Sequence, residues 1–145
     1  MKVRIKRVDT TLRLPQYETE GAVAFDFYCR VTTTIEPNAV EHVPANFIIE
    51  VPKGMMLLIT SRSSTPKRTG LMVANGVGTI DQDYCGDEDE LKIALYNTRT
   101  TAVTVERGER IAQGVLLPIE RAEFEEVTQM NKASRGGFGT TGTHI

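Results

Sequence analysis

Arg62 lies among hydroxyl side chains in the segment SRSSTPKRTG, residues 61–70. Its guanidinium offers a planar fork of donors that matches the oxygens of a phosphate, and serine hydroxyls beside it add further donors. Pro66 and Gly70 indicate a turn here. The segment is therefore a candidate phosphate-binding loop, and a solvated polar loop is the alternative interpretation.

An amide, two carboxylates and an aromatic ring lie close together in ANGVGTIDQDY, residues 74–84. Asn75-Gly76 is a strong signal for a hairpin turn, and Gly78 would allow the backbone to approach a ligand closely. Asp81 and Asp83 are two residues apart, so in an extended strand they would share one face. The alternative is a surface hairpin with two solvated acids.

The glycine-rich segment SRGGFGTTGTHI, residues 134–145, has no pattern that could bury it. A frayed tail is one interpretation, because terminal residues are often poorly ordered. Arg135 and Phe138 favour another, which is a mobile flap that orders over a ligand. The cation would then meet an anion, the ring would cover a flat group, and backbone N–H groups and threonine hydroxyls would reach phosphate oxygens.

Two polar residues interrupt apolar stretches. Gln113 lies within RGERIAQGVL, residues 107–116. A buried amide needs hydrogen-bond partners, so this side chain either satisfies backbone groups or points at a ligand. Asp26 lies between two phenylalanines in AVAFDFYC, residues 22–29, and strict strand alternation would turn it towards solvent.

The composition excludes several classes of protein. A net charge of −2 argues against a nucleic-acid-binding domain with a broad basic face. Two cysteines, Cys29 and Cys85, are too few for a disulfide framework and favour a reduced, intracellular chain. No apolar run approaches the ~20 residues of a membrane span, and MKVRIKRVDT lacks the apolar stretch of a signal peptide. Two histidines argue against a histidine-based metal site.

Short strands with frequent turns dominate the pattern. A length of 145 residues suggests one domain. Turn signals at short intervals predict an all-β sandwich or barrel. Residues 121–130 fit either a short helix or an edge strand. The predicted strands cover residues 3–8, 22–29, 46–52, 55–60, 90–97, 101–106 and 111–119.

In chain order, AFDF, SRSS, NGVGTIDQDY, RGERIAQ and RGGFGTTG resemble the five motifs of the trimeric dUTP diphosphatase (dUTPase) family. The resemblance runs from about residue 15 to residue 142. It implies a jelly-roll-like β-barrel, the dUTPase-like β-clip, that forms a homotrimer with active sites between subunits. Residues 1–133 would be the barrel, and residues 134–145 the flexible flap that closes the site.

The resemblance implies hydrolysis of dUTP to dUMP and pyrophosphate, which lowers dUTP and supplies dUMP for thymidylate synthesis. Asp81 matches the carboxylate that activates a water for in-line attack on the α-phosphorus. Mg²⁺ is the implied cofactor, held mainly by the substrate phosphates. Asp26 matches an acid that meets this ion through water.

The other motif residues are implied to bind the substrate. Phe138 would stack on uracil, and Tyr84 would pack against the deoxyribose and leave no room for a 2′-hydroxyl. The base and sugar contacts implied are Asn75, Gly78, Thr79, Ile80, Tyr84 and Lys92. The phosphate contacts implied are Arg62, Ser63, Ser64, Gln113, Arg135, Gly139, Thr140 and Thr141.

The chain departs from the family pattern at Ala24 and Ser64, where glycine is usual, and in the acidic residues 87–90, expected to form a solvent-facing bulge. These departures resemble a viral or phage-like member, which would be cytoplasmic or lie inside the host cell. A dCTP deaminase-like or bifunctional enzyme is one alternative, but Ala94 stands where that chemistry needs a glutamate. The other is a regulatory member that grips a protein partner through the acidic residues.

Overall fold

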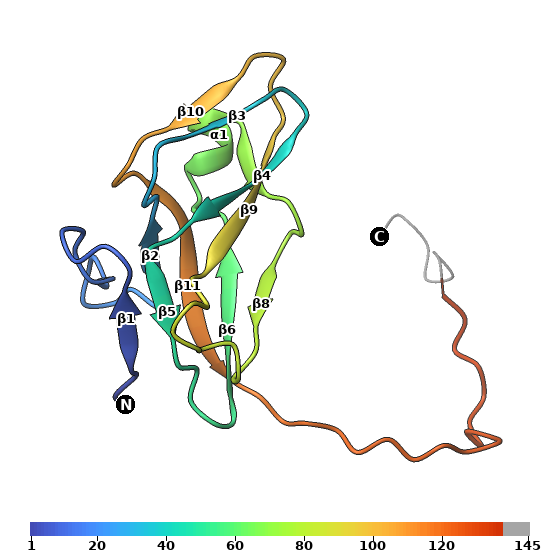
Figure 1. The fold of residues 1–145 in the computed structure, drawn as a ribbon. Helices are drawn as coiled ribbons and strands as arrows, with labels where there is room; N and C mark the ends of the chain where they lie inside the picture. The colour runs from blue at the N-terminus through green and yellow to red at the C-terminus, as the bar shows by residue number, and fades with distance from the viewer. Residues whose placement is uncertain (138–145) are drawn as a thin grey trace.

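The computed structural model describes residues 1–137, and these form an all-β protein, as predicted (Figure 1). The predicted strand at residues 55–60 is found with the same bounds. Within the described range the elements are β1 (Ile5–Arg7), β2 (Phe25–Tyr28), β3 (Thr33–Ile35), β4 (Val40–Pro44), β5 (Phe47–Ile49), β6 (Met55–Thr60), α1 (Thr65–Thr69), β7 (Leu71–Val73), β8 (Gly78–Ile80), β9 (Lys92–Asn97), β10 (Val103–Val105) and β11 (Arg110–Pro118).

The strands pair antiparallel in four sheets. One sheet has the order β2-β11-β6-β8 and another the order β4-β9-β7, and β1-β5 and β3-β10 are two-stranded. Strand β6 is hydrogen-bonded along both edges, so Leu57 lies opposite Leu116 of β11 and opposite Ile80 of β8. Figure 1 shows β11, β6 and β8 side by side through the middle of the body.

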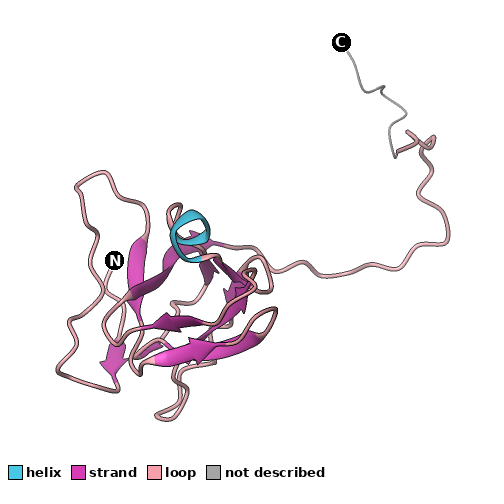
Figure 2. Cartoon of the chain, turned by 90° about the horizontal axis from the view of Figure 1, so that it is seen from above, coloured by secondary structure: helices cyan, strands magenta, loops and turns pink. Residues whose placement is uncertain are grey.

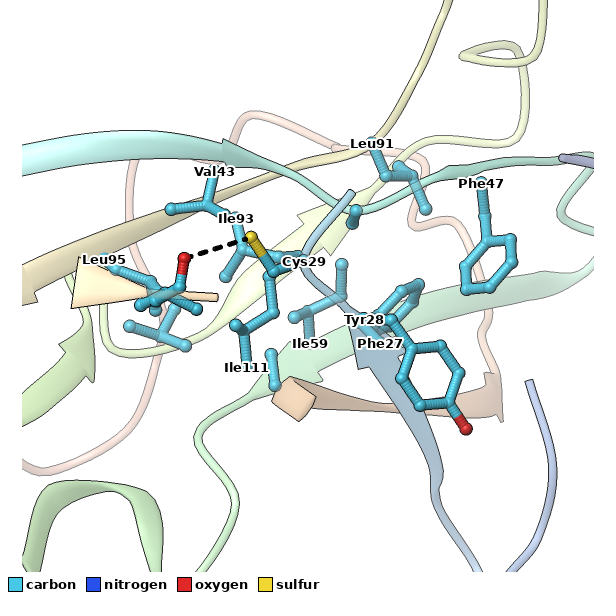
Figure 3. Close-up of a cluster of buried hydrophobic side chains, with 14 of the residues drawn as sticks. Phe27, Tyr28, Cys29, Val43, Phe47, Ile59, Leu91, Ile93, Leu95 and Ile111 are labelled. Carbon is cyan, nitrogen blue, oxygen red and sulfur yellow. Dashed lines mark hydrogen bonds between the residues drawn. The ribbon is translucent and has the colours of Figure 1, made fainter. Parts of the chain in front are cut away.

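The core lies between these sheets (Figure 3). Side chains from β2, β4, β5, β6 and β9 meet in it, and alternate residues of β9 point inwards, as a period of two requires. The fully buried side chains include Phe27, Val43, Phe47, Leu57 and Leu95.

Strand β2 is buried on both faces, so the prediction that Asp26 faces solvent is wrong. Its exposed fraction is 6%. Arg62 and Arg110 cover the Asp26 carboxylate, and on the same face Arg13 lies over the Tyr28 ring and donates from Nε to its hydroxyl at 2.7 Å. Alternation along a strand predicts exposure only where nothing covers the second face.

The predicted hairpin at residues 74–84 is also wrong. Strand β7 pairs with β9 and β8 pairs with β6, so the turn at Asn75-Gly76 carries the chain from one sheet to another. Gly76 adopts a φ of +72° there. Because β8 ends at Ile80, Asp81 and Asp83 lie in the following turn and do not share a strand face.

The segment after β11 leaves the body as an extended chain (Figures 1 and 2). Residues 121–130 form neither the helix nor the edge strand that their pattern allowed. The turn predicted at Pro66 and Gly70 is a single helical turn, α1, which ends at Gly70 in a left-handed conformation. Over residues 1–137, no helix has the length and apolar character needed to cross a membrane.

The packing at Gly114 generates the first prediction. A Cβ there would lie 2.7 Å from Phe27 Cε2 and 3.1 Å from both Leu57 Cδ1 and Phe25 Cζ. We expect Gly114→Ala to lower the free energy of unfolding by about 1–3 kcal/mol, as overpacking does. Urea denaturation measures this. The matched control is Gly21→Ala, where no atom lies within 4 Å of the added carbon. Equal urea midpoints for the two variants would contradict the packing of β11 on β2.

Candidate active site

Two adjoining hollows lie beside β8, with volumes of about 160 and 370 Å³. We name them together the β8 pocket. They share four lining residues, which join β8 to β4 and β9: His42, Thr79, Ile80 and Lys92. The full lining of the β8 pocket is His42, Ile59, Val73, Asn75, Gly78, Thr79, Ile80, Asp81, Tyr84, Leu91, Lys92, Ile93 and Ala94.

Backbone packing fixes the wall of the β8 pocket. Gly78 pairs with Ile59 of β6, and a Cβ on it would lie 3.3 Å from the Ile59 Cβ. That contact is tighter than ordinary, so glycine lets β8 approach β6 closely. The turn before it is closed by a hydrogen bond from Gly76 N to the Val73 carbonyl at 3.0 Å. Asn75 is held in this turn at one end of the pocket.

Asp81 is the first residue after β8, and it lies between two hollows. It lines the β8 pocket and also a cleft of about 500 Å³ that contains Gln82 and Arg121. The Gln82 amide donates to the Met55 carbonyl at 2.8 Å, which anchors the turn that carries Asp81. The Asp81 carboxylate is exposed, so a water can reach it beside a molecule bound in the β8 pocket.

A second group of residues gathers around Asp26, and we name it the Asp26 cluster. Arg62 Nε donates to Asp26 Oδ1 at 2.8 Å, and Arg110 Nη1 donates to Oδ2 at 3.1 Å. Two cations therefore compensate a carboxylate that is withdrawn from water. Arg110 also lies 3.4 Å from the Glu18 carboxylate.

Arg62 is held by its Nε atom alone. Among residues 1–137 its two terminal nitrogens have no protein partner, so they are available to an anion. The exposed Ser63 and Ser64 follow directly. Gln113 lies opposite Asp26 in the sheet, and its amide donates to the Ser61 carbonyl at 3.4 Å. One N–H of Gln113 thus satisfies a backbone group, and the amide has a second N–H that a ligand could accept from.

Asp81 and Asp26 lie far apart in one protomer. Gln113, opposite Asp26, pairs with Thr60 of β6, whereas Ile80 pairs with Leu57. Ile80 and Asp26 are therefore separated by roughly 10 Å along the strands and by about 14 Å across the three strand spacings from β8 to β2. The carboxylates of Asp81 and Asp26 therefore cannot act on one phosphorus atom within a single protomer.

Arg107, in the turn before β11, has a structural role. It donates to Asp9 at 2.6 Å and to the Thr11 hydroxyl at 2.5 Å. The guanidinium and the Thr11 donors hold the pKa of Asp9 well below its ordinary value. The pair ties residues 9–11 to the turn that leads to Gln113.

The acidic residues 87–90 divide between surface and interior. Asp87 and Glu88 are exposed, as predicted for a solvent-facing bulge. Asp87 pairs with Lys6 at 2.9 Å, and this cation lowers the pKa of Asp87. The prediction is wrong for Glu90, which is 8% exposed and points into the protein towards Arg30.

The remaining predicted site residues lie in or beyond the extended segment. Arg135 is exposed in the segment that leaves the body after β11. Phe138, Gly139, Thr140 and Thr141 lie outside the described residues. The sequence reasoning missed three residues beside the predicted ones, which are His42, Arg110 and Arg121. Arg110 could have been predicted from the sequence, because it belongs to the same motif, RGERIAQ, as Gln113. The residues around His42 and Arg121 form no motif that would have indicated a site.

Similarity to known proteins identifies the family of this chain. The family model for dUTPase matches residues 10–142. The chain belongs to the dUTPase family. A deoxyuridine 5′-triphosphate nucleotidohydrolase of Desulfotalea psychrophila is 41% identical over 140 residues, which are 94% of this chain and 91% of that protein.

Solved structures share the fold. The crystal structure of a dUTPase from Streptococcus mutans matches with a TM-score of 0.76 at 30% identity, over 83% of this chain and 98% of that chain. A mutant dUTPase from phage phi11 of S. aureus, described with a structural Mg(II) ion, matches with a TM-score of 0.80 at 20% identity, over 91% of this chain and 100% of the other. The likeness to S. mutans extends the family relationship to the three-dimensional fold.

Proposed function

We propose that this dUTPase family member hydrolyses dUTP to dUMP and pyrophosphate, and so supplies dUMP and removes dUTP. The observation that carries the proposal is the position of Asp81, which shares one pocket with Asn75, Tyr84 and Lys92. A carboxylate stands there at the mouth of a slot whose wall is glycine-containing backbone. The relatives' activity on deoxyuridine triphosphate supports the same substrate.

The β8 pocket suits uracil. Uracil presents two carbonyl acceptors and one N–H donor, and the backbone of Gly78 and Thr79 and the amide of Asn75 can match them. A uracil ring held closely against the backbone of β8 would leave no room for the extra methyl of thymine. Groups placed to hydrogen-bond a substrate edge reject a substrate that lacks it more strongly than an apolar pocket does.

The sugar and the reacting phosphate would follow along the pocket towards its mouth. Tyr84 lines the same hollow as Asp81, in the place proposed for the deoxyribose. Asp81 would accept a proton from a water that attacks the α-phosphorus in line. The bond from that phosphorus to the bridging oxygen breaks, and pyrophosphate leaves with the bonding electrons. Positioning and charge neutralisation supply most of the rate in such transfers.

The phosphate donors would come from a second protomer. Arg62, Ser63, Ser64 and Gln113 lie with the Asp26 cluster, and Asp26 is too far from Asp81 to act on the same phosphorus within one chain. A homotrimer with shared sites, as the resemblance implies, resolves this separation. The flap residues from Arg135 to Thr141 are proposed to close the site.

Exposed apolar surface also supports assembly. The extended segment carries Phe124 at 94% exposed and Met130 at 76%. An apolar hollow of about 280 Å³ lies on the body between Val3, Leu14 and Tyr17. Apolar surface of this kind on a soluble chain marks an interaction site.

Mg²⁺ is the proposed cofactor, and the residues present fit an ion carried by the substrate. Within residues 1–137 no group of three or more metal-ligating side chains occurs. Both oxygens of Asp26 already accept from arginine, so this acid would reach the ion only through a water. The ion would neutralise phosphate charge.

We propose a cytoplasmic location for the protein. Cys29 and Cys85 are free thiols, which is compatible with a reducing compartment.

The deaminase alternative is disfavoured by the floor of the β8 pocket. Ala94 lines it at the position where that chemistry requires a glutamate. An alanine side chain cannot transfer a proton. Among the residues that line the β8 pocket, Asp81 is the one carboxylate, and it lines the hollow that Ala94 does not.

The proposal is tested by incubating the protein with Mg²⁺ and dUTP, dCTP, dTTP or UTP, and measuring pyrophosphate and ammonia. We expect pyrophosphate from dUTP alone. Ammonia from dCTP would establish the deaminase. Neither product from any substrate would favour the regulatory, non-catalytic alternative.

The role of Asp81 predicts the effect of one substitution. Asp81→Asn should still bind dUTP but turn it over at least ~100-fold more slowly, the usual scale for a positioned base. Single-turnover kinetics and calorimetry of binding separate the two effects. Asp83→Asn is the matched control in the same turn, and near-normal turnover by Asp81→Asn would remove this residue from its proposed role.

The flap predicts the outcome of a truncation. Deleting residues 134–145 should leave a folded trimer that has lost nearly all activity, because the body of each chain is untouched while the closing residues are gone. Light scattering reports the assembly and pyrophosphate release reports the activity. Full activity of the truncated chain would show that the segment is not a functional flap.

A further inference from the structure

The loop that follows Tyr84 is closed by its own hydrogen bonds. Asp89 N donates to the Gly86 carbonyl at 3.0 Å, and Gly86 N donates back to Asp89 Oδ2 at 2.7 Å. The loop ends at Glu90, whose side chain turns away from the β8 pocket into the protein. Glu90 is therefore the point at which this loop is fastened to the body.

Glu90 is fastened by a bidentate ion pair. Arg30 Nε and Nη2 donate to Glu90 Oε1 and Oε2, each at 2.7 Å. The backbone N of Asn46 also donates to Oε1, at 2.9 Å. Two parallel charge-assisted bonds fix direction as well as distance. The carboxylate holds the pKa of Arg30 above its ordinary value. The Arg30–Glu90 ion pair thus ties the loop to the end of β2 and to the turn between β4 and β5.

Residues before and after the loop that ends at Glu90 line the β8 pocket. Tyr84, Leu91 and Lys92 line the same hollow. The Tyr84 hydroxyl donates to the carbonyl oxygen of Glu90 itself, at a long distance of 3.4 Å. Leu91 is held by backbone hydrogen bonds to Ala45 and Phe47, each at 2.9 Å. The Tyr84 hydroxyl therefore contacts the backbone of a residue whose side chain is held by Arg30 and Asn46.

We propose that the Arg30–Glu90 ion pair is a positioning element for Tyr84 and so sets how strictly the pocket rejects a ribonucleotide. The inference rests on the proposed function, which assigns Tyr84 to the deoxyribose. A 2′-hydroxyl is excluded only if the ring cannot retreat. A displacement of about 1 Å in a positioned group can change a rate by ~100-fold. The pair would limit that retreat by fixing Glu90, whose carbonyl oxygen accepts from the Tyr84 hydroxyl.

The test replaces both partners, as Arg30→Met with Glu90→Gln. No buried charge is left unpaired, and the glutamine oxygen can still accept from Asn46 N. The measurement is kcat/KM for dUTP, UTP and dTTP with Mg²⁺. We expect the dUTP/UTP ratio to fall about 10-fold or more. The dUTP/dTTP ratio should not change, because the base is read by β8, which the pair does not hold.

Two further variants complete the test. The exposed pair Arg4–Glu50, at 2.8 Å with side chains 89% and 47% exposed, provides the matched control. Arg4→Met with Glu50→Gln should keep both ratios. Arg30→Lys keeps the charge but loses the fork, so it should lower the dUTP/UTP ratio by a smaller factor. This variant decides the question if the double replacement does not fold.

The outcomes are distinct. Folded Arg30 variants with the wild-type dUTP/UTP ratio would overturn the positioning role while leaving the proposed function intact. An equal fall in both ratios would also overturn it, because that result means general loosening of the pocket. A wild-type protein without activity on dUTP would overturn the proposed function and, with it, this role.

Discussion

Strand β6 is hydrogen-bonded along both edges, and this double pairing determines where chemistry can occur. Its ladder with β8 places Gly78, Thr79 and Ile80 along the pocket. Its ladder with β11 places Gln113 beside Ser61 and Asp26. A strand paired on both sides cannot shift its register without moving every side chain to the opposite face. The spacing between the pocket and the Asp26 cluster is therefore a rigid property of the sheet.

Buried charge in this protein is always compensated, and the compensation shapes the site. Within the described residues, every buried side-chain nitrogen or oxygen has a hydrogen-bond partner. Asp26 is satisfied by two arginines and Glu90 by one arginine and a backbone amide. These carboxylates orient cations and backbone. The proposed catalytic acid, Asp81, is instead exposed, as a group that must exchange protons with water requires.

Motif order and spacing predicted which residues share the β8 pocket, but not how they are held. Asn75 and Lys92 line one of its two hollows, and Asp81, Tyr84 and Lys92 line the other; the roles that the resemblance implies for them stay predictions. Asn75-Gly76 does form a turn, as predicted. The same two residues favour a turn whether the strand after it pairs with the strand before it or joins another sheet. Only the long-range pairing of β8 with β6 decides that.

Burial was the least predictable property, because it depends on segments distant in sequence. Asp26 is covered by Arg62 and Arg110, which come 36 and 84 residues later in the chain, and no pattern within residues 22–29 reports that. Glu90 is buried because its partner, Arg30, is 60 residues earlier in the chain. A run of acidic residues predicts an exposed segment, and this prediction fails for a residue such as Glu90 that has a distant cationic partner.

The separation of the two residue groups has a genetic consequence in the trimer that we propose. A lesion in Arg62 and a lesion in Asp81 would damage different halves of a centre. Two defective copies of the gene, each altered in one half, could then complement each other by building one intact centre from mixed subunits. A subunit altered at both residues would instead inactivate two centres of a mixed trimer, and its gene would be dominant-negative.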